Sequence, residues 1–375
     1  MNTRIYDPIH GFITITPLMK KFIDTEEFQR LRDLKQLGAT TFVFPSANHT
    51  RFEHSIGVSY LAGLMMDNLK KNSSFMINER EIELCRIAGL LHDIGHGPFS
   101  HLYDDHIRGE NELVHEDRGC NIIRNMVRKY NIQLTDFELD DIIKMVNPGE
   151  DDKYNWKYQV VANKINQLDV DKLDYIQRDS FYLGMKCSGE YSRIINDAKI
   201  FKLDGEKTII AWPIKLQYEI FQVFATRYRL HKQVYNHPNV KACEFIIIEI
   251  LENISKNIVN LSKMGDSIIY CKYGDILRTK LFQRIHFKFI GEFTFVNDEI
   301  SDNRGGYIKY MEENNIFYQK LEIGFGGNKN PIENIKYFND NKLVRHNPSM
   351  FSFMIPETHK EILIRVYCKN MNNYE

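Results

Sequence analysis

The stretch LLHDIGHGPFSH, residues 90 to 101, places three histidines and an aspartate directly behind an apolar run. The run has the length and composition of a helix, and two glycines and a proline then stop that helix from continuing. Ionisable side chains in an apolar setting are costly unless they are paired or bind a metal. We therefore predict a chemical task for the four ionisable residues here, which are His92, Asp93, His96 and His101.

Composition narrows the class of protein. The 375 residues are 43% hydrophobic and 26% charged, with a net charge of −1 and a pI near 6.9. This charge does not indicate nucleic-acid binding, so a polyanion would have to be held by a local pocket of Lys, Arg or metal. No apolar run reaches the roughly 18 residues of a membrane span, and the N-terminal sequence does not resemble a secretory signal. Six scattered cysteines without a CxxC motif favour reduced thiols, so we expect a soluble intracellular protein, cytoplasmic or nuclear, that makes no membrane contact.

Hydrophobic spacing predicts helices through most of the first 260 residues. They are a capped pair within residues 16–37, then 54–69, 80–93, 115–130, 136–146 and a long helix over 213–237 that opens with Pro213. One exception is residues 198–212, where two β-prone runs flank Asp204-Gly205 and predict a hairpin.

The composition and the hydrophobic pattern of the sequence change after about residue 262. Two segments, 286–296 and 361–370, are typical of strands, whereas residues 297–345 are rich in Asn, Gly and Asp. We predict a mainly α protein with a helical lobe over residues 1–260 and a smaller α+β lobe over 261–375.

A metal site is the first candidate for the histidines. Together with His92 and Asp93, the distant His54 and Asp171 form a mixed nitrogen and oxygen ligand set that suits Zn, Fe, Mn or Ni. Spacing alone does not show that these residues converge. Taken singly, each of these histidines could instead be a packed core residue, and each aspartate could be a solvated surface residue.

Three longer blocks carry a resemblance to a known family. TRFEHSIGVSYLAGL (50–64), IAGLLHDIGHGPFSHLYD (87–104) and DVDKLDYIQRD (169–179) resemble the hallmark blocks of HD-domain phosphohydrolases. They are most similar to the deoxynucleoside triphosphate (dNTP) triphosphohydrolases that join a SAM domain to an HD domain. The likeness begins at DPIHGFI (7–13), includes RLHKQVYNH (229–237) and covers nearly the whole chain, and no SAM domain is expected before it.

The resemblance implies a fold and a reaction. The fold is an HD-domain helical bundle with a short β-hairpin, and the reaction is dGTPase-like cleavage of a dNTP at the α-phosphorus, which gives a deoxynucleoside and inorganic triphosphate. It also implies a divalent transition metal (Zn, Fe or Mn) at His54, His92, Asp93 and Asp171, with Mg an option on the substrate phosphates.

The resemblance also assigns the remaining site residues. His101 is the expected general acid, oriented by Asp104, and His96 and His115 lie near the phosphates, with Glu116 placed to hold a histidine tautomer. The phosphates are expected to meet Arg51, Lys172, Tyr175, Arg227 and His231, and the sugar to meet Gln36, Leu37, Asp179 and Tyr235.

Regulation is left open by the sequence. Asp24, Gln29 and Arg32 match a guanine-reading allosteric trio, so a guanine nucleotide activator and a homodimer or homotetramer are expected from the family. Tyr6, Trp212, Ile214 and Pro238 stand where that family has Asn and cations, which predicts weak or absent activation.

Two other functions stay open at this point. One is an HD phosphohydrolase that acts on nucleoside monophosphates, cyclic nucleotides or single-stranded nucleic acid. The other is a non-catalytic module that binds nucleotides or RNA.

Overall fold

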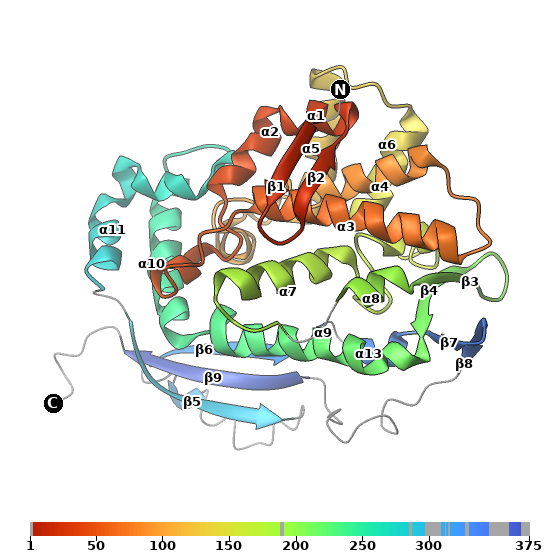
Figure 1. Cartoon of the computed structure of the whole chain (residues 1–375). Coiled ribbons are helices and arrows are strands. Elements are labelled where there is room, and N and C mark those ends of the chain that lie inside the picture. The colour runs from red at the N-terminus through yellow and green to blue at the C-terminus, as the bar shows by residue number, and fades with distance from the viewer. Residues whose placement is uncertain are drawn as a thin grey trace.

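The computed structural model describes residues 3–187, 191–284, 287–296, 309–311, 313, 316–326, 330–344 and 360–368. These residues form a mainly helical fold, as predicted (Figure 1). The helices are α1 (Pro17–Ile23), α2 (Glu26–Gln29), α3 (Arg51–Asn72), α4 (Glu79–Leu91), α5 (His115–Lys129), α6 (Asp136–Val146), α7 (Val170–Tyr182), α8 (Tyr191–Asn196), α9 (Gln217–Leu230), α10 (Pro238–Ser255), α11 (Asp275–Phe282) and α13 (Pro331–Asn334). The strands are β1 (Thr3–Asp7), β2 (Gly11–Ile15), β3 (Lys199–Lys202), β4 (Thr208–Pro213), β5 (Lys288–Val296), β6 (Phe317–Gly324), β7 (Tyr337–Asn339), β8 (Lys342–Val344) and β9 (Lys360–Cys368).

The core lies between long helices. α3 packs against α4 and α7, and α7 packs against α9 (Figure 1). Apolar side chains of these helices, such as Ile56, Leu91, Leu173 and Phe224, are buried in one cluster. Within the described residues, no helix combines the length and the apolar composition that crossing a bilayer requires.

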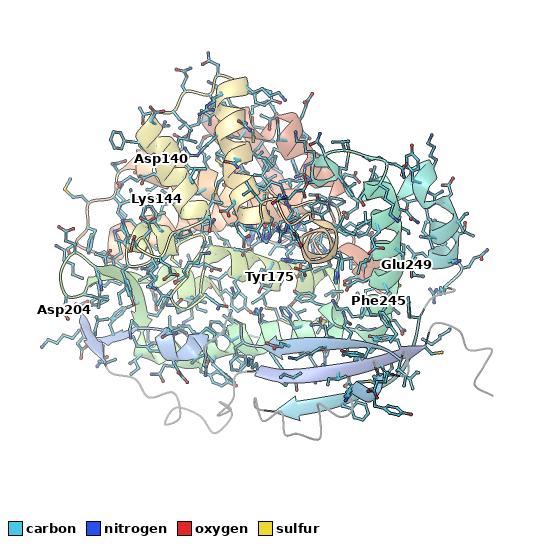
Figure 2. All side chains as sticks on the ribbon, turned by 180° about the vertical axis from the view of Figure 1, so that it is seen from behind. Asp140, Lys144, Tyr175, Asp204, Phe245 and Glu249 are labelled. Atoms are coloured by element: carbon cyan, nitrogen blue, oxygen red, sulfur yellow. The ribbon has the colours of Figure 1, made fainter. Side chains whose placement is uncertain are left out.

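The predicted elements of the first lobe are largely present. The four helices predicted between residues 54 and 146 are α3 to α6, and the 198–212 hairpin is formed by β3 and β4, with Gly205 in the left-handed region at φ +72°. Figure 2 shows Asp204 at the tip of that hairpin. A second hairpin, β1–β2, was not predicted.

Two predicted helices have different boundaries. The helix expected up to residue 37 ends at Gln29 and continues only as a 3-10 turn over Arg30–Asp33. Tertiary contacts explain this ending, because Arg30 donates to three backbone carbonyls and the Lys35 amide binds a distant carboxylate. Pro213 is also not a first helical residue, since it ends β4 and pairs with Phe338, so α9 begins at Gln217.

Within the described residues, the C-terminal part adds one sheet of its own and extends the β3–β4 hairpin with β7 and β8. β5, β9 and β6 form an antiparallel sheet that runs beneath α9 and α10 in Figure 1, with the predicted strands as β5 and β9. Phe245 of α10, labelled in Figure 2, packs edge-to-face on Tyr367 with 5.1 Å between ring centroids. The ends of the predicted strand segments, residue 286 and residues 369–370, lie outside the described residues.

The Asn-rich region 297–345 contains elements that composition did not predict. Its described parts include β6, α13, β7 and β8, and β7 pairs in parallel with β4 of the first lobe. Phe325 and Tyr337 are buried in the same cluster as the long helices. The two-lobe division at residue 260 therefore remains a prediction. Residues on the two sides of that boundary pack extensively against each other.

Candidate metal and nucleotide site

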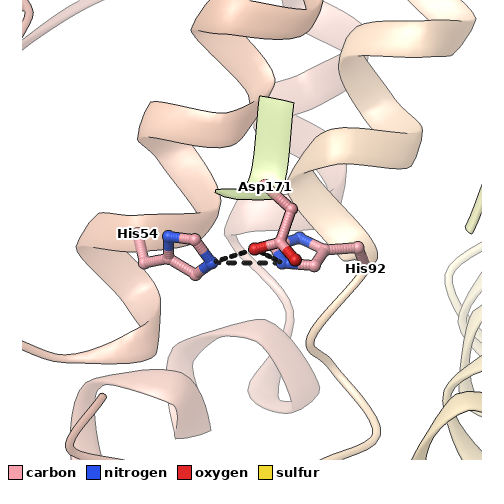
Figure 3. A group of neighbouring side chains, drawn as sticks. All are labelled: His54, His92 and Asp171. Carbon is pink, nitrogen blue, oxygen red and sulfur yellow. Dashed lines mark hydrogen bonds and ion pairs between the residues drawn. The ribbon is translucent and has the colours of Figure 1, made fainter. Parts of the chain in front are cut away.

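Three predicted metal ligands converge between helices. His54 lies in α3, His92 follows the last residue of α4, and Asp171 lies in the first turn of α7 (Figure 3). The Nε2 atom of His54 is 3.2 Å from Nε2 of His92 and 3.0 Å from Oδ1 of Asp171. One candidate ligand atom from each of these three residues lies within 4.8 Å of the other two, a spacing that fits one divalent ion.

The back of each histidine is held by the protein. Nδ1 of His54 is 2.8 Å from Oδ2 of Asp174, and Nδ1 of His92 is 2.8 Å from the carbonyl oxygen of Gly89. When Nδ1–H donates to such an acceptor, Nε2 keeps its lone pair for the front of the site. Both rings are thus oriented with Nε2 toward the shared position, and the donor set fits the predicted metal.

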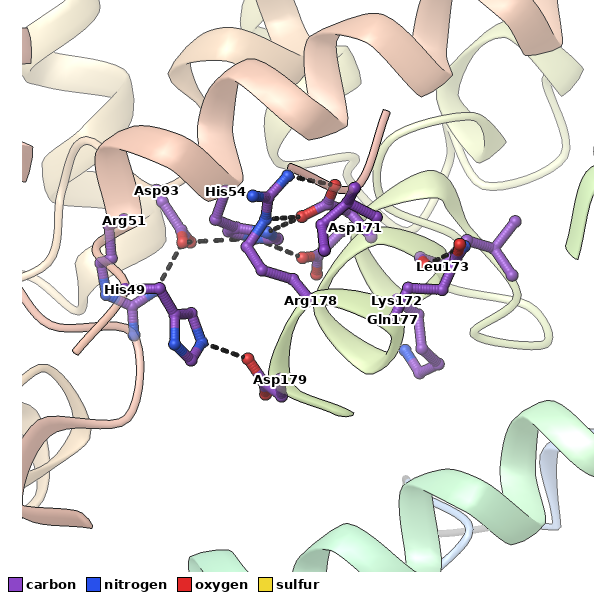
Figure 4. A network of polar contacts seen from close by, with 12 residues as sticks. His49, Arg51, His54, Asp93, Asp171, Lys172, Leu173, Gln177, Arg178 and Asp179 are labelled. Carbon is purple, nitrogen blue, oxygen red and sulfur yellow. Dashed lines mark hydrogen bonds and ion pairs between the residues drawn. The ribbon is translucent and has the colours of Figure 1, made fainter. Parts of the chain in front are cut away.

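Asp174 is a buried hub that the sequence analysis missed. Its carboxylate also accepts from His10 at 2.6 Å and from the Arg178 guanidinium at 2.8 and 3.0 Å, and Arg178 in turn reaches Asp7. Figure 4 shows Arg178 next to His54 and Asp171. A Cβ on Gly57 of α3 would lie 2.1 Å from the Asp174 carboxylate, so a glycine is required there. The signal was present, because His10 and Asp174 both lie inside the family-like blocks.

The hub and the ligands also set the charge of the site. Burial opposes a charge on His54, but hydrogen bonds to Asp171 and Asp174 outweigh it and raise the pKa of His54 to about 10. The pKa of Asp171 is correspondingly lowered, because hydrogen bonds to His54 and His92 overcome its burial. The carboxylates that stabilise a proton on His54 would equally stabilise a metal cation, whose binding would displace that proton from Nε2.

Asp93, the fourth predicted ligand, lies at the edge of this group. Its Oδ1 is 3.4 Å from Nε2 of His92 and its Oδ2 is 3.7 Å from Nε2 of His54. Arg51, the first residue of α3, forms an ion pair with Asp93 and donates through Nε to Ser100 Oγ at 2.8 Å. The side chain of Arg51 therefore joins the metal group to the loop that follows it.

Three histidines gather beside the metal group. The His96 ring stacks on the His115 ring at 4.1 Å between centroids, and His101 lies edge-on to both, at 5.4 and 5.6 Å. Gly95 permits this approach, because a Cβ there would lie 2.0 Å from the carbonyl oxygen of His115 at the start of α5. Nε2 of His96 is 3.3 Å from Oδ1 of Asp93, which connects the trio to the metal side.

Asp104 orients a different histidine from the one predicted. Its Oδ2 lies 2.8 Å from Nδ1 of His115, and its Oδ1 accepts from Arg118 at 2.8 Å. Glu116 lies 3.4 Å from the same His115 nitrogen, so the predicted tautomer contact involves His115. A π-helical turn over Tyr103–Ile107 places Asp104, and such turns are frequent at functional sites.

Two of the three histidines, His96 and His101, have lowered pKa values, which favours their uncharged form. Burial, followed by the nearby positive charge of Arg51, lowers the pKa of His96 well below its usual value. The same two causes lower the pKa of His101. His101 is exposed to solvent at its surface, but many protein atoms lie around its ring. A bound polyanion would oppose this shift and favour protonated imidazole.

The residues predicted to meet the sugar lie around Asp179. His49 Nε2 is 2.7 Å from Asp179 Oδ1, and the hydroxyl of Tyr235 donates to Asp179 Oδ2. The backbone amide of Gln36 donates to the His49 carbonyl, next to Leu37, while Oε1 of Gln36 is buried without a hydrogen-bond partner among the described residues. The His49 ring stacks on Tyr182 with 4.5 Å between centroids. His49 was missed because it lies just before the block that begins at Thr50.

The residues predicted to meet the phosphates lie on α7 and α9. Lys172 Nζ is 3.7 Å from Asp169 and 6.0 Å from the centre of the Tyr175 ring. Arg227 donates through Nη1 to the carbonyl of Gly324 at 2.7 Å, whereas its buried Nε has no partner among the described residues. His231, one turn later, lies edge-on to Tyr235, and a second π-helical turn over His231–Tyr235 carries both.

The predicted allosteric trio is only partly assembled. Arg32 donates to Gln29 Oε1 at 2.8 Å and lies 3.5 Å from the centre of the Phe52 ring, while Asp24 pairs with Lys20. Trp212 is fully buried and donates to the Ile194 carbonyl, so it fills the core.

A cavity of about 400 Å³ is lined by residues other than the metal group. It is lined by Arg32, Asp33, Lys35, Thr41, Phe42, Phe99, Asp266, Ser267, Ile269 and Tyr270. Arg32 of the predicted allosteric trio is among them, but none of the predicted metal ligands or substrate-binding residues is. The candidate chemistry therefore rests on the side-chain geometry around His54 and not on this cavity.

The sequence of this chain is similar to those of known proteins. The HD domain family matches residues 51–179, which include all four predicted metal ligands. The deoxynucleoside triphosphate triphosphohydrolase SAMHD1 homolog of Dictyostelium discoideum is 32% identical, over 99% of this chain and 78% of that protein. Human deoxynucleoside triphosphate triphosphohydrolase SAMHD1 is 31% identical over 98% of this chain and 70% of its own length. The HD domain-containing protein L394 of Acanthamoeba polyphaga mimivirus is 33% identical over 96% of this chain and 91% of its own length.

The likeness to these relatives therefore runs well beyond the HD segment, through both parts of the chain, and confirms the resemblance that the sequence blocks indicated. This chain belongs to the family of HD-domain deoxynucleoside triphosphate triphosphohydrolases.

Proposed function

We propose that this protein hydrolyses dNTPs, dGTP among them, at the α-phosphorus and releases a deoxynucleoside and inorganic triphosphate. The convergence of His54, His92 and Asp171 within 4.8 Å, beside three stacked or edge-on histidines, is the observation that carries the proposal. Family membership supports the same reaction.

The proposed metal is Zn, Fe or Mn, held by His54, His92 and Asp171 with Asp93 at the edge. When bound, a divalent ion supplies Lewis-acid polarisation of a phosphoryl oxygen and lowers the pKa of a water molecule. Mg on the substrate phosphates is compatible with this arrangement.

The protein's own side chains supply the other parts of the reaction. His101 would donate a proton to the departing 5′ oxygen, because cleavage at the α-phosphorus leaves an alkoxide that needs one. Arg51 would bind a phosphoryl oxygen close to the metal, and His96 and His115 would lie along the α-phosphate, with Asp104 and Glu116 orienting His115.

The triphosphate and the sugar are assigned to separate sides. Lys172, Tyr175, Arg227 and His231 would bind the phosphates. Gln36, Leu37 and Asp179 would hold the 3′ side of the sugar, and the Tyr235 ring would pack on the 2′ carbon. Gln36 Oε1 and Arg227 Nε are buried and have no partner in the part of the chain that the structure describes. They support these roles because such atoms gain most from a ligand that completes their hydrogen bonds.

Regulation and assembly are finer proposals. We infer a homodimer or homotetramer, as expected for the family, with weak or absent dependence on a guanine nucleotide. The burial of Trp212, where a phosphate-binding cation was expected, supports weak dependence.

One assay tests this function against its alternatives. Purified protein is incubated with each dNTP and with Mn, Fe, Zn or Mg, with and without GTP, and the products are separated by ion-exchange chromatography. The expected products are deoxynucleoside and triphosphate, with at most a few-fold effect of GTP. Release of monophosphate or pyrophosphate, cleavage of cyclic nucleotides or single-stranded nucleic acid only, or binding without turnover would each contradict the proposal.

A further inference from the structure

A short segment after the helical core contacts two loops of the candidate site. Asp266 is only 6% exposed, and each of its carboxylate oxygens accepts a backbone amide. Oδ1 accepts from Phe99 at 2.6 Å, and Oδ2 accepts from Lys35 at 2.9 Å. One carboxylate thus joins the loop that ends in His101 to the loop that carries Gln36 and Leu37.

The loop before His101 has a backbone that needs support. Phe99 and Ser100 are consecutive non-glycine residues in the left-handed region, at φ +57° and +53°. This region is sparsely populated by side-chain-bearing residues, and such residues persist only where surrounding contacts hold them. Arg51 holds this loop at Ser100 Oγ, and Asp266 holds it at the Phe99 amide.

The neighbours of Asp266 fasten the same segment. Arg30 donates to the carbonyls of Met264, His96 and Ile94, at 3.1, 2.8 and 2.8 Å. Asp33 accepts from the Ser267 amide and hydroxyl. A Cβ on the intervening Gly265 would lie 2.1 Å from the Asp33 carboxylate, so the segment docks closely.

We propose that Asp266 is a positioning residue for hydrolysis: its two carboxylate oxygens set the distance between the loop of His101 and the loop of Gln36. A carboxylate suits the position because two converging amides need two acceptors. An asparagine would turn an NH₂ group toward one amide and leave that amide unsatisfied. This inference rests on the proposed function and adds a residue from beyond the helical core to it.

The protonation of Asp266 offers a distinctive readout. Burial raises the pKa of Asp266 to about 6, although the amide hydrogen bonds act in the opposite direction. The charged groups that face it are Asp33, which raises the pKa, Arg51, which lowers it, and Arg30. The carboxylate accepts both amides above about pH 6, whereas the protonated acid below that pH resembles asparagine.

The experiment compares wild type with Asp266→Asn across pH. At pH 8 we expect kcat/KM for dGTP to fall about 10- to 100-fold, the scale of a small misplacement of reacting groups. Bound metal should be retained, as measured by elemental analysis. The ratio of wild-type to variant activity should shrink toward one as the pH falls from 8 to 5. A variant that only folds less well would instead lose bound metal and kcat together, with KM unchanged.

A matched control is Asp275→Asn, which makes the same change at an exposed carboxylate of α11 that pairs with Arg278. It should stay within about twofold of wild type. If Asp266→Asn does not fold, Asp266→Glu takes its place and should keep the metal while lowering kcat/KM at pH 8.

The outcomes separate the two proposals. A wild-type protein that hydrolyses no dNTP overturns the function and the positioning role together. An active wild type with an Asp266→Asn variant of equal activity, or with a ratio that does not change with pH, overturns the positioning role alone. For Asp266→Glu, wild-type kinetics at pH 8 would overturn it.

Discussion

The two halves of the candidate site differ in how far the protein completes them. On the metal half, Nδ1 of His54 and Nδ1 of His92 are both held from behind, and Asp174 is hydrogen-bonded on both oxygens. On the nucleotide half, Gln36 Oε1 and Arg227 Nε are buried without a partner among the described residues. The metal half is organised by the protein alone, whereas the nucleotide half is arranged to be completed by a ligand.

The strongest way to break this comparison is to remove a metal ligand. His92→Ala or Asp171→Ala should abolish both hydrolysis and bound transition metal, because a preorganised set loses most of its affinity with one donor. Elemental analysis and the dGTP assay measure the two losses. Asp140→Ala, at a solvent-exposed carboxylate on α6 (Figure 2), should change neither. Undiminished turnover by wild type in chelator would contradict a metal role.

The next largest effect is expected at the boundary between the halves. His101→Ala should lower kcat about 10²- to 10⁴-fold, the usual worth of a positioned proton donor, while the metal stays bound. His106→Ala, which removes a neighbouring exposed histidine, is the matched control and should remain near wild type. A His101→Ala rate within a few-fold of wild type would mean that the trio serves packing.

The smallest effect sharpens the nucleotide half. Tyr235→Ala should lower the ratio of kcat/KM for dGTP to kcat/KM for GTP by about 10- to 200-fold. Without the ring, the pocket has room for the 2′-hydroxyl of GTP. Tyr235→Phe keeps the ring but removes the hydroxyl that donates to Asp179, so it should keep most of the discrimination. If both activities fall together at a constant ratio, Tyr235 is scaffold and discrimination lies elsewhere.

Sequence blocks predicted the residues of the site better than their partners. His54, His92 and Asp171 come together as the family resemblance implied, although spacing alone did not show it and α7, which carries Asp171, was not among the predicted helices. The partner of Asp104 could not be predicted, because proximity in sequence favoured His101 and a π-helical turn instead aims it at His115. Asp174 was missed because an aspartate within a helix usually faces solvent, and only the packing of α3 on α7 buries it.

The fold shows the same division between local and distant causes. The hydrophobic spacing of α3 to α6 was sufficient to predict them. The early end of α2 depends on Arg30 and Asp266, which are more than 200 residues apart, so no local pattern records it. β7 and β8 lie in a stretch whose Asn and Gly content is typical of loops. The pairing of β7 with β4, and of β8 with β7, supplies the order that composition does not.

The parallel pairing of β7 with β4 has a consequence for the newly made chain. About 120 residues separate the two strands, and synthesis at about 5–20 residues per second would take roughly 6–25 s to cover them. During that interval the edge of β4 and the apolar surface that later receives Phe325 and Tyr337 would be uncovered on the ribosome. We expect a chaperone to bind nascent chains whose synthesis is stalled between β4 and β7. This binding should be lost once residue 337 has emerged from the ribosome.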